Sequence, residues 1–368
     1  MPDVTCPFCF TRTNPKGLFL RCAPVCGSDG TEFAASSMNR ERLCPHGRPP
    51  QVRRLCPDCR RDLLREYVEG DHQMIAMIGD QASGKSTYVG VLVHELQRQV
   101  GERFNGLALD LLGEESRAYY ERGFGGPLYQ QQRTPQPTRA LRGQAAKRHD
   151  PLMFALRFPR PRRIPGIGGN PRTALTVFYD TAGEESLRPD NMEFLTNYLG
   201  AAAGVMLVVD AGTLIGASPE ASRTGRDPIR PVHVLAEHLR ETSRRPQARL
   251  KTPLAVVITK IDLIRADFET SSALCRESRH DGYFDDGDSR EVHEELRSWL
   301  GEHGLLHVDR SIATNFETHR WFGVSALGHA PTGGDDISAA GIHPYRVEDP
   351  MLWLLARFGA VKTNGGRP

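Results

Sequence analysis

The chain has 368 residues, a formal net charge of +2 and 39% hydrophobic residues. This length suits one large domain or two, and the near-neutral charge gives no general argument for nucleic-acid binding. No run of about 18 apolar residues occurs, which argues against a membrane-spanning helix. The first residues, MPDVTCPFCF, lack a charged segment followed by an apolar one, so we expect no secretory signal and a cytoplasmic protein without a membrane role.

Seven of the eight cysteines lie before residue 60, in closely spaced groups. With one histidine, the groups are Cys6 and Cys9, Cys22 and Cys26, Cys44 and His46, and Cys56 and Cys59. Short spacers let two ligands share one tetrahedral zinc ion, whereas a disulfide scaffold needs an oxidising compartment. We predict a zinc-knuckle, ribbon-like module over residues 1–65 with one or two structural Zn²⁺ ions. The pairing of the groups, sequential or interleaved, stays open.

The partners of such a module are usually proteins or nucleic acids. Four arginines, Arg53, Arg54, Arg60 and Arg61, follow the third group and could contact an anionic partner such as nucleic acid. A solvated surface is the simpler interpretation of these side chains. We therefore expect protein partners, with nucleic acid as the alternative.

After a predicted linker at 66–72, apolar strands alternate with amphipathic helices, which predicts an α/β fold with a mainly parallel sheet and helices on both faces. Strands are predicted at 74–78, 152–158, 174–180, 204–210, 254–259 and 321–325. Helices are predicted at 85–100, 114–123, 190–200, 231–244, 288–301 and 349–358. Insertions are predicted at 101–150, at 159–172 as a hairpin tip, and at 274–288, and a flexible tail at 361–368.

The first apolar strand runs into the sequence GDQASGKS, which has the phosphate-loop pattern G-x-x-x-x-G-K-[ST] between a strand and a helix. The residues expected to contact a nucleotide are Gly79, Asp80, Gln81, Ala82, Ser83, Gly84, Lys85, Ser86 and Thr87. Lys85 would reach the phosphate oxygens, and the Ser86 hydroxyl would bind Mg²⁺.

The third strand ends in DTAGE, at the sheet edge where the phosphate loop lies. Asp180 can hold Mg²⁺, usually through a water, and Gly183 can offer its backbone N–H to a γ-phosphate. Glu184 follows at the position that would orient the attacking water.

The strand at 254–259 ends in TKID, and the last strand ends in SAL. The Asp262 carboxylate can accept two hydrogen bonds from guanine N1 and N2, a donor pair that adenine lacks, and the Lys260 stem can cover the base. The remaining residues expected at the base are Thr259, Ser325, Ala326 and Leu327. These motifs in this order predict a guanine-nucleotide site and disfavour an ATPase.

The ordered set GDQASGKS, DTAGE, TKID and SAL resembles the translation-factor and Ras-related (TRAFAC) class of P-loop GTPases over about residues 73–360. With the Cys-rich N-terminus and the C-terminal RVEDPMLWLL, the chain is similar to the bacterial double-GTPase-like family. The resemblance implies a Ras-like G domain that binds GTP and GDP with Mg²⁺. It also implies a role in a multi-gene bacterial system, in some members one of defence.

Three positions depart from the pattern of that class. Thr259 replaces the usual Asn, and its hydroxyl can make part of the same hydrogen bonding. Glu184 replaces a common Gln, and a carboxylate cannot donate to the transferring phosphoryl group, so we expect slow hydrolysis. The third departure is the metal-binding threonine of the first switch, which is not evident at its usual short distance. The candidates are Thr134 and Thr138, of which Thr138 resembles the family placement.

We therefore predict a GTPase switch that hydrolyses GTP to GDP and phosphate and controls protein partners. Lys85, Thr138, Gly183 and Glu184 are its predicted catalytic residues. Ser86, Thr138 and Asp180 are its predicted Mg²⁺ ligands. The alternative is a pseudo-GTPase adaptor that binds nucleotide structurally and recruits partners through its zinc module.

Overall fold

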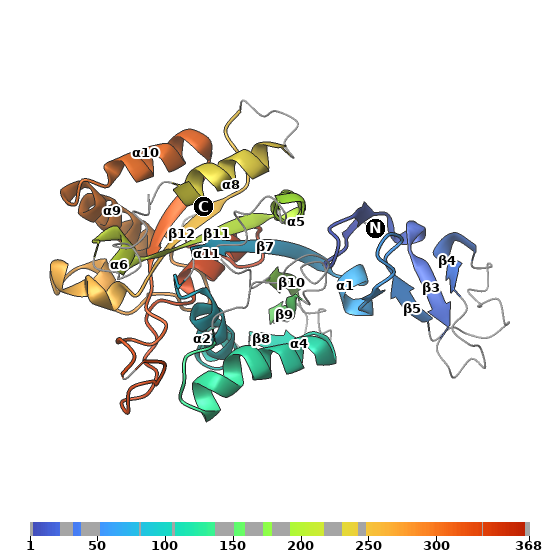
Figure 1. Ribbon diagram of the computed structural model, residues 1–368, viewed down its shortest axis with the longest axis horizontal. Coiled ribbons are helices and arrows are strands. Elements are labelled where there is room, and N and C mark those ends of the chain that lie inside the picture. The colour runs from blue at the N-terminus through green and yellow to red at the C-terminus, as the bar shows by residue number, and fades with distance from the viewer. Residues whose placement is uncertain are drawn as a thin grey trace, which may run out of the picture.

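The computed structural model (Figure 1) has an α/β domain with a Cys-rich module at one end of its sheet. It describes residues 3–22, 32–37, 52–80, 82–104, 107–136, 151–158, 172–178, 192–216, 230–241, 248–332 and 334–364. Eight of the predicted site residues lie outside these ranges: Cys26, Cys44, His46, Gln81, Thr138, Asp180, Gly183 and Glu184.

A seven-stranded sheet in the order β13-β12-β11-β7-β10-β9-β8 forms the centre of the α/β domain. Its strands are β7 (Asp71–Gly79), β8 (Ala108–Leu111), β9 (Leu152–Phe158), β10 (Arg172–Phe178), β11 (Gly204–Asp210), β12 (Leu254–Thr259) and β13 (His319–Gly323). The five strands from β13 to β10 are mutually parallel, and β9 runs antiparallel to both of its neighbours. The α/β fold with a mainly parallel sheet is therefore confirmed.

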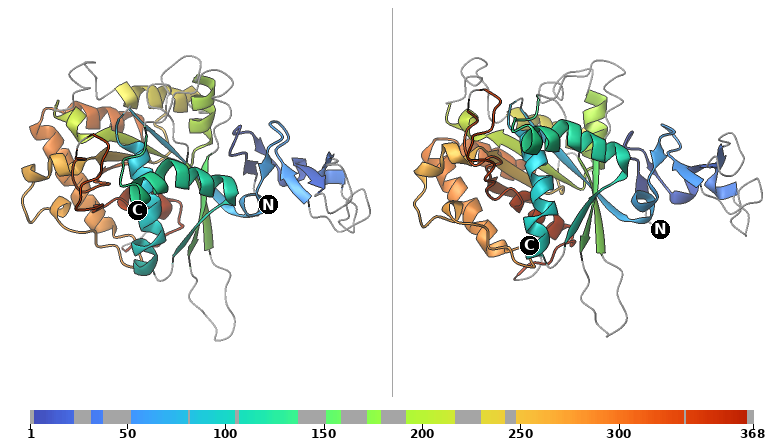
Figure 2. Two further views of the ribbon diagram at one scale, coloured as in Figure 1. Left: turned by 60° about the horizontal axis from the view of Figure 1, so that its bottom comes forward. Right: turned by 90° about the horizontal axis from the view of Figure 1, so that it is seen from below.

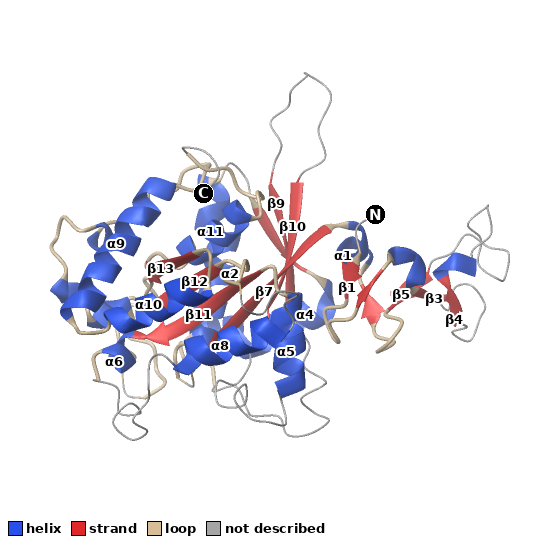
Figure 3. Ribbon diagram, turned by 90° about the horizontal axis from the view of Figure 1, so that it is seen from above, coloured by secondary structure: helices blue, strands red, loops and turns tan. Residues whose placement is uncertain are grey.

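Helices cover both faces of this sheet (Figure 3). They are α2 (Lys85–Gln97), α3 (Gln99–Arg103), α4 (Gly113–Tyr120), α5 (Met192–Ala201), α6 (Ala211–Leu214), α8 (Arg230–Glu241), α9 (Asp286–Glu302), α10 (Leu306–Asn315) and α11 (Asp349–Arg357). Alternate residues of β7 enter different cores, because successive side chains of a strand point to opposite faces. Met74, Ala76 and Ile78 belong to the core that also contains residues of α5, α8 and α9, whereas Ile75 and Met77 belong to the core that contains residues of α2 and α11.

The segment 101–150, predicted as an insertion, supplies part of the domain itself. β8 extends the sheet by pairing with β9, from Ala108 opposite Arg157 to Leu111 opposite Phe154. A π-helix, Glu121–Gln130, follows α4 and packs on α2. At the end of α4, the Tyr120 hydroxyl also contacts α2, donating to the Gly90 carbonyl at 3.0 Å. The prediction missed β8 because the strand is four residues long and has exposed positions.

The Cys-rich module contains two small antiparallel sheets. One pairs β1 (Val4–Thr5) with β2 (Arg12–Thr13), and the other has the order β4-β3-β5-β6. The latter strands are β3 (Phe19–Cys22), β4 (Glu32–Ala34), β5 (Val52–Leu55) and β6 (Asp62–Leu63). In both views of Figure 2 the module, in blue, lies to one side of the α/β domain.

The segment 66–72, predicted as a linker, is ordered as most of helix α1 (Arg65–Glu69) and the start of β7. Tyr67 in α1 is 1% exposed, and its hydroxyl donates to the Thr5 carbonyl at 2.8 Å. The Thr5 N–H donates to His72 at 3.3 Å. One buried core continues across this junction, from Val4 and Cys6 of the module to Met74 of β7. The module is therefore packed on the α/β domain.

The third predicted insertion, 274–288, is anchored by the C-terminal RVEDP sequence. Arg346 is buried and donates to Asp288 at 2.8 Å and to Asp349 at 2.6 Å. Asp285 caps the N-terminus of α9 by accepting from the Asp288 N–H at 3.0 Å. The clustered aspartates of this segment are thus used to begin a helix and to neutralise a buried guanidinium.

Candidate functional site

The phosphate loop connects the carboxyl end of β7 to the first turn of α2. Gly84 has φ +82° at the N-cap of α2 and Ala82 has φ +58°, so the loop contains two residues in the left-handed conformation, which glycine adopts without steric cost. A Cβ on Gly79 would lie 2.3 Å from the Val208 carbonyl oxygen, so only glycine fits where β7 meets β11. The backbone therefore has the form that a phosphate chain requires at a helix N-terminus.

The Lys85 side chain lies inside this loop and is 7% exposed. Its Nζ donates to the Gly79 carbonyl at 2.9 Å, to the Asp80 carbonyl at 2.7 Å and to Ser83 Oγ at 3.3 Å. The ammonium group is thus held within the ring of loop atoms. Ser86 and Thr87 follow in the first turn of α2.

The TKID segment follows β12 and contacts the phosphate loop directly. Thr259 Oγ1 lies 2.7 Å from the Ser83 carbonyl and 3.1 Å from the Val209 carbonyl. Lys260 Nζ donates to the Ala82 carbonyl at 3.1 Å. The Thr259 hydroxyl thus ties the TKID segment to the phosphate loop, and the role of this segment in binding the base stays a prediction.

The SAL sequence meets Asp262 at the same edge of the sheet. Ser325 Oγ donates to Asp262 Oδ1 at 2.5 Å and accepts from the Gly328 N–H at 2.9 Å. Ser325 also exchanges two backbone hydrogen bonds with Tyr345, at 3.0 and 2.7 Å. Ala326 and Leu327 follow in this loop. The arrangement fixes one carboxylate oxygen of Asp262, so that the orientation of the carboxylate is set by the protein.

Asp210 is a residue of this site that the sequence analysis did not single out. It ends β11, accepts from Lys260 Nζ at 2.9 Å and from the Gly212 N–H at 2.8 Å, and is 7% exposed. It therefore positions the lysine expected to cover the base. The available signal was its place as the final carboxylate of a buried strand, at the same edge as Asp262.

Of the two switch-threonine candidates, only Thr134 lies within the described residues. Its N–H donates to the Asp335 carbonyl at 2.8 Å, and its hydroxyl lies 3.4 Å from Asp335 Oδ1. The neighbouring Arg133 pairs with Asp336 at 3.0 Å. Thr134 is therefore engaged by the loop that follows SAL, and the assignment of Thr138 as the switch threonine stays a prediction.

Four of the cysteines predicted as zinc ligands come together in the module. The ligand atoms of Cys6, Cys9, Cys56 and Cys59 all lie within 4.8 Å of one another. The Cys6 and Cys59 sulfurs are 3.7 Å apart, and those of Cys9 and Cys56 are 3.5 Å apart. Sulfurs placed tetrahedrally at about 2.3 Å from a zinc ion would be roughly 3.8 Å apart. The geometry fits a closed four-sulfur metal site.

This site joins the first and fourth groups, an arrangement that neither of the two predicted pairings describes. Each group forms a similar turn: the Cys6 N–H donates to Thr11 and the Phe10 N–H to Cys6, while the Cys56 N–H donates to Arg61 and the Arg60 N–H to Cys56. Cys22 is buried at the end of β3. Its predicted companions Cys26, Cys44 and His46 lie outside the described residues, so a second zinc ion stays a prediction.

Crowding of the four sulfurs shifts their acidities. A hydrogen bond from Cys59 lowers the pKa of the Cys56 thiol to about 7, and one from Cys56 holds the pKa of Cys9 below its usual range. The pKa of Cys6 is raised, chiefly by the hydrogen bond with Cys56. A bound dication would favour the thiolate form of all four, and the structural role leaves no open position for a catalytic water.

The four arginines considered for nucleic acid are engaged by residues of the module or of α1. Arg53 pairs with Asp62 at 3.0 Å, Arg54 with Glu69 at 2.7 Å and Arg60 with Glu32 at 3.3 Å. Arg61 lies over the Phe8 ring, 3.7 Å from its centroid. These contacts give no support to the predicted nucleic-acid interaction.

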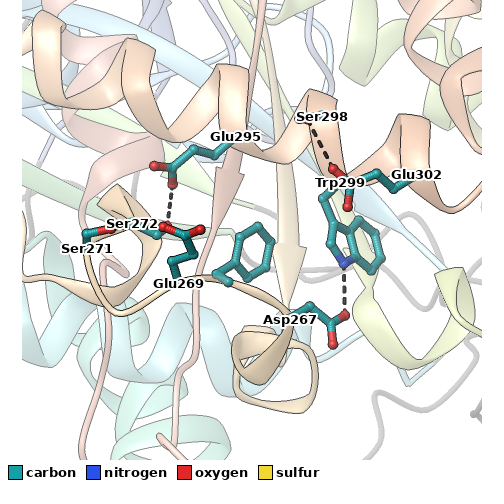
Figure 4. Close-up of a pocket in the computed structure, with 9 residues that line it drawn as sticks. Asp267, Glu269, Ser271, Ser272, Glu295, Ser298, Trp299 and Glu302 are labelled. Carbon is teal, nitrogen blue, oxygen red and sulfur yellow. Dashed lines mark hydrogen bonds between the residues drawn. The ribbon is translucent and has the colours of Figure 1, made fainter.

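A pocket of about 280 Å³ lies beside α9, lined by none of the motif residues (Figure 4). Its polar groups are satisfied among themselves. Glu295 accepts from the Ser272 hydroxyl at 2.5 Å and from the Ala273 N–H at 2.9 Å, and Asp267 accepts from Trp299 Nε1 at 2.9 Å. These bonds cap the turn at 272–275 and orient the indole, so we assign the pocket a structural role.

None of the helices in the described part of the chain combines the length and apolar character needed to cross a membrane.

Known proteins similar to this chain include one curated relative and several solved structures. The relative, from Mycolicibacterium smegmatis, is described as "Putative ESX-1 scaffolding and assembly protein SaeC" and is 29% identical over 405 residues, covering 97% of this chain and 99% of its own.

Among solved structures, the GTPase-like domain of S. cerevisiae Ski7 bound to GTP is 13% identical, with a TM-score of 0.31. The match covers 73% of this chain but only 48% of that one. The Arl6 BBS3 small GTPase from Trypanosoma brucei is 13% identical, with a TM-score of 0.27 and coverage of 79% and 99%. Scores this low add no argument to the fold described above.

The family whose model matches is described as Double-GTPase 2, and the match covers residues 73–309. This range is more than half of the chain and includes the phosphate loop, DTAGE and TKID. It agrees with the resemblance drawn from the motifs. The chain belongs to the Double-GTPase 2 family.

Proposed function

We propose that the protein is a GTP-binding switch that hydrolyses GTP to GDP and phosphate with Mg²⁺ and thereby controls protein–protein interactions. The observation that carries the guanine assignment is the Asp262 carboxylate, held by Ser325 at 2.5 Å beside the phosphate loop. An oriented carboxylate pairs with the two adjacent donors of guanine, N1–H and N2–H, and finds no such pair on adenine.

The described residues support binding of the whole nucleotide. Backbone N–H groups of the phosphate loop and the Lys85 ammonium would neutralise the phosphates, and the Ser86 hydroxyl would be one ligand of Mg²⁺. The metal supplies charge neutralisation at the phosphate oxygens. Thr259 and Lys260 attach the TKID segment to the phosphate loop, and Asp210 holds the Lys260 ammonium, so that base and phosphates would be bound at one edge of the sheet.

For hydrolysis, we propose that Asp180 and Thr138 complete the Mg²⁺ site, that Gly183 contacts the γ-phosphate and that Glu184 orients the attacking water. A carboxylate at this last position accepts from water but donates nothing to the phosphoryl group. We therefore propose a slow intrinsic rate that a partner can accelerate.

The partners that we propose are proteins of a multi-component assembly. The support is the relative named as a scaffolding and assembly protein, which aligns over nearly its whole length. The same name favours a second candidate function, a scaffold protein that binds the nucleotide but does not hydrolyse it. Single-turnover hydrolysis with purified protein, with and without cell lysate, distinguishes the two: no release of phosphate under either condition would favour the scaffold.

The guanine assignment is tested with Asp262→Asn. An amide in place of the carboxylate presents a donor where guanine also has a donor, whereas xanthine has a carbonyl there. We expect calorimetric titration to show that the wild type binds GTP and GDP at least about 100-fold more tightly than ATP, and that the variant prefers XTP to GTP.

The matched control is Asp336→Asn, on the loop after SAL, which pairs only with the exposed Arg133 among the ion pairs described. It should retain the preference for GTP. Tight ATP binding by the wild type, or an unchanged GTP preference in Asp262→Asn, would contradict the guanine assignment.

A further inference from the structure

The first cysteine turn of the module packs directly on α5, the helix that follows DTAGE in the chain. The Phe10 ring lies 5.2 Å from the Phe194 ring in an edge-to-face arrangement with an interplanar angle of 67°. It also lies 5.6 Å from the Tyr198 ring. Phe10 is 9% exposed, although it belongs to a small module at the end of the molecule.

The same helix is fastened to the strand that leads into the phosphate loop. The Tyr198 hydroxyl accepts from the Met77 N–H at 3.0 Å and lies 3.3 Å from the Ile75 carbonyl. Tyr198 therefore contacts both the ring of Phe10 and the backbone of β7, two residues before Gly79. A single side chain links the cysteine turn to the base of the nucleotide site.

The backbone of Phe10 is set by the cysteine turn. Phe10 has φ +64°, a conformation that glycine adopts without steric cost and other residues rarely adopt. Its N–H donates to the Cys6 carbonyl at 3.0 Å, directly after Cys9. A metal held by Cys6 and Cys9 would fix this turn, and with it the direction of the Phe10 ring.

The second cysteine turn offers an internal comparison. Arg60 occupies the equivalent position, with φ +58°, directly after Cys59. Its guanidinium lies 3.6 Å from the centroid of Phe19 and pairs with Glu32, both within the module. The two turns thus share a backbone form, but among the described contacts only the first turn places an aromatic side chain on α5.

We infer that Phe10 is a positioning residue that couples the four-cysteine metal site to the nucleotide site through α5. The segments around DTAGE respond to the γ-phosphate in GTPases, and α5 is the next element in the described part of the chain. A helix that is positioned differently in the two nucleotide forms must change its contact with Phe10, and therefore the free energy of the metal-bound turn. By thermodynamic reciprocity, the metal then changes the relative affinity for GTP and GDP. The inference rests on the proposed GTP binding and on metal binding by the four cysteines.

The test measures the zinc dissociation constant of the full chain by competition with a chelator, in the presence of GDP and of a non-hydrolysable GTP analogue. We expect the two constants to differ at least about fivefold in the wild type. Phe10→Gly keeps the left-handed backbone and removes the ring, so the two constants should become equal. Arg60→Gly makes the same backbone change in the second turn and should retain the wild-type difference.

A second variant addresses the same contact from the other side. Phe194→Leu alters α5 without changing any residue of the module. It removes one of the two aromatic contacts of Phe10 and leaves the one with Tyr198, so it should reduce the difference. Hydrogen exchange over 192–201 should depend on zinc in the wild type and in Arg60→Gly, and should lose this dependence in Phe10→Gly.

Equal constants in the wild type, or a difference that stays undiminished in both Phe10→Gly and Phe194→Leu, would overturn the coupling while leaving GTP and zinc binding in place. Absence of guanine-nucleotide binding in the wild type would overturn the proposed function, and the coupling with it, whereas absence of zinc would overturn the metal site and the coupling alone. The two failures are therefore distinguishable.

Discussion

Replacement of Arg346 by methionine should strongly destabilise the α/β domain. The Arg346 side chain is 1% exposed, and its two carboxylate partners, Asp288 and Asp349, are 0% and 2% exposed. The guanidinium also donates to the Ala273 carbonyl at 3.0 Å and to the Arg276 carbonyl at 3.3 Å. It thus joins the start of α9, the start of α11 and the turn at 273–276, which precedes α9 in the chain.

The magnitude follows from the charges that would remain. Removal of one partner from a buried ion pair lowers the free energy of unfolding by about 3–5 kcal/mol, because the other charge stays buried without a partner. Asp288 would retain Arg276 at 3.1 Å, and Asp349 would retain His280 at 3.1 Å. These remaining contacts place the expected loss at the lower end, about 3 kcal/mol. Methionine keeps most of the side-chain volume, so the loss in the free energy of unfolding comes mainly from the missing charge and less from a cavity.

The assay is urea unfolding of wild type and Arg346→Met, followed by far-ultraviolet circular dichroism at constant nucleotide concentration. The matched control is Arg133→Met, because Arg133 and its partner Asp336 are 61% and 54% exposed. We expect the control to lose less than about 1 kcal/mol. Nucleotide affinity should also fall in Arg346→Met, since the adjacent Tyr345 holds Ser325 through two backbone hydrogen bonds.

Addition of Asp288→Asn to Arg346→Met should recover part of the loss, because it removes one of the stranded charges. A loss of less than about 1 kcal/mol in Arg346→Met would refute the reasoning that the guanidinium neutralises two buried carboxylates. A double variant that is less stable than the single one would refute it as well.

Two further predictions concern metal content and pH. Cys56→Ser should lower the zinc content by one ion per chain in elemental analysis, whereas Cys275→Ser, outside the cluster, should leave it unchanged; an unchanged content in Cys56→Ser would exclude this site. Burial, assisted by the charges of His319 and Arg320, lowers the pKa of His293 to about 4, so the unfolded chain binds a proton at higher pH than the folded one. The free energy of unfolding should therefore fall by up to about 3 kcal/mol between pH 6.5 and pH 4, a slope that His293→Gln should largely remove in urea unfolding. Equal slopes in the two proteins would contradict this origin.

Much of the fold could be predicted because its strands are short apolar runs bounded by motif residues. β9, β11 and β12 begin and end where the hydrophobic pattern places them. α10 was missed because its sequence, LHVDRSIATN, mixes polar residues with few apolar ones. Its burial depends on packing beside α9, which no local pattern records.

The motifs of the predicted nucleotide site could be recognised for a different reason: their residues stand at fixed spacing after a strand. Asp210 escaped notice because it has no motif of its own and is defined by its contact with Lys260, 50 residues away in the chain. The pairing of the cysteine groups was equally unreadable, because each turn is locally complete and the choice of partner is made by tertiary packing. Phe10 shows the same limit, since only its neighbours on α5 distinguish it from Arg60.

Because the metal site joins the first and the fourth cysteine groups, it has a consequence for how the chain folds during synthesis. Cys9 and Cys56 are separated by 47 positions, so a metal that bridges them acts as a cross-link around nearly the whole module. Treated as a loop closure, this link restricts the unfolded chain by about 4 kcal/mol at 25 °C. Cys59, the last of the four, precedes α1 by six positions and β7 by twelve. During synthesis the chain therefore completes this metal site and the first strand of the large sheet almost together, and a ribosome-bound fragment that ends before Cys56 carries only half of the ligands.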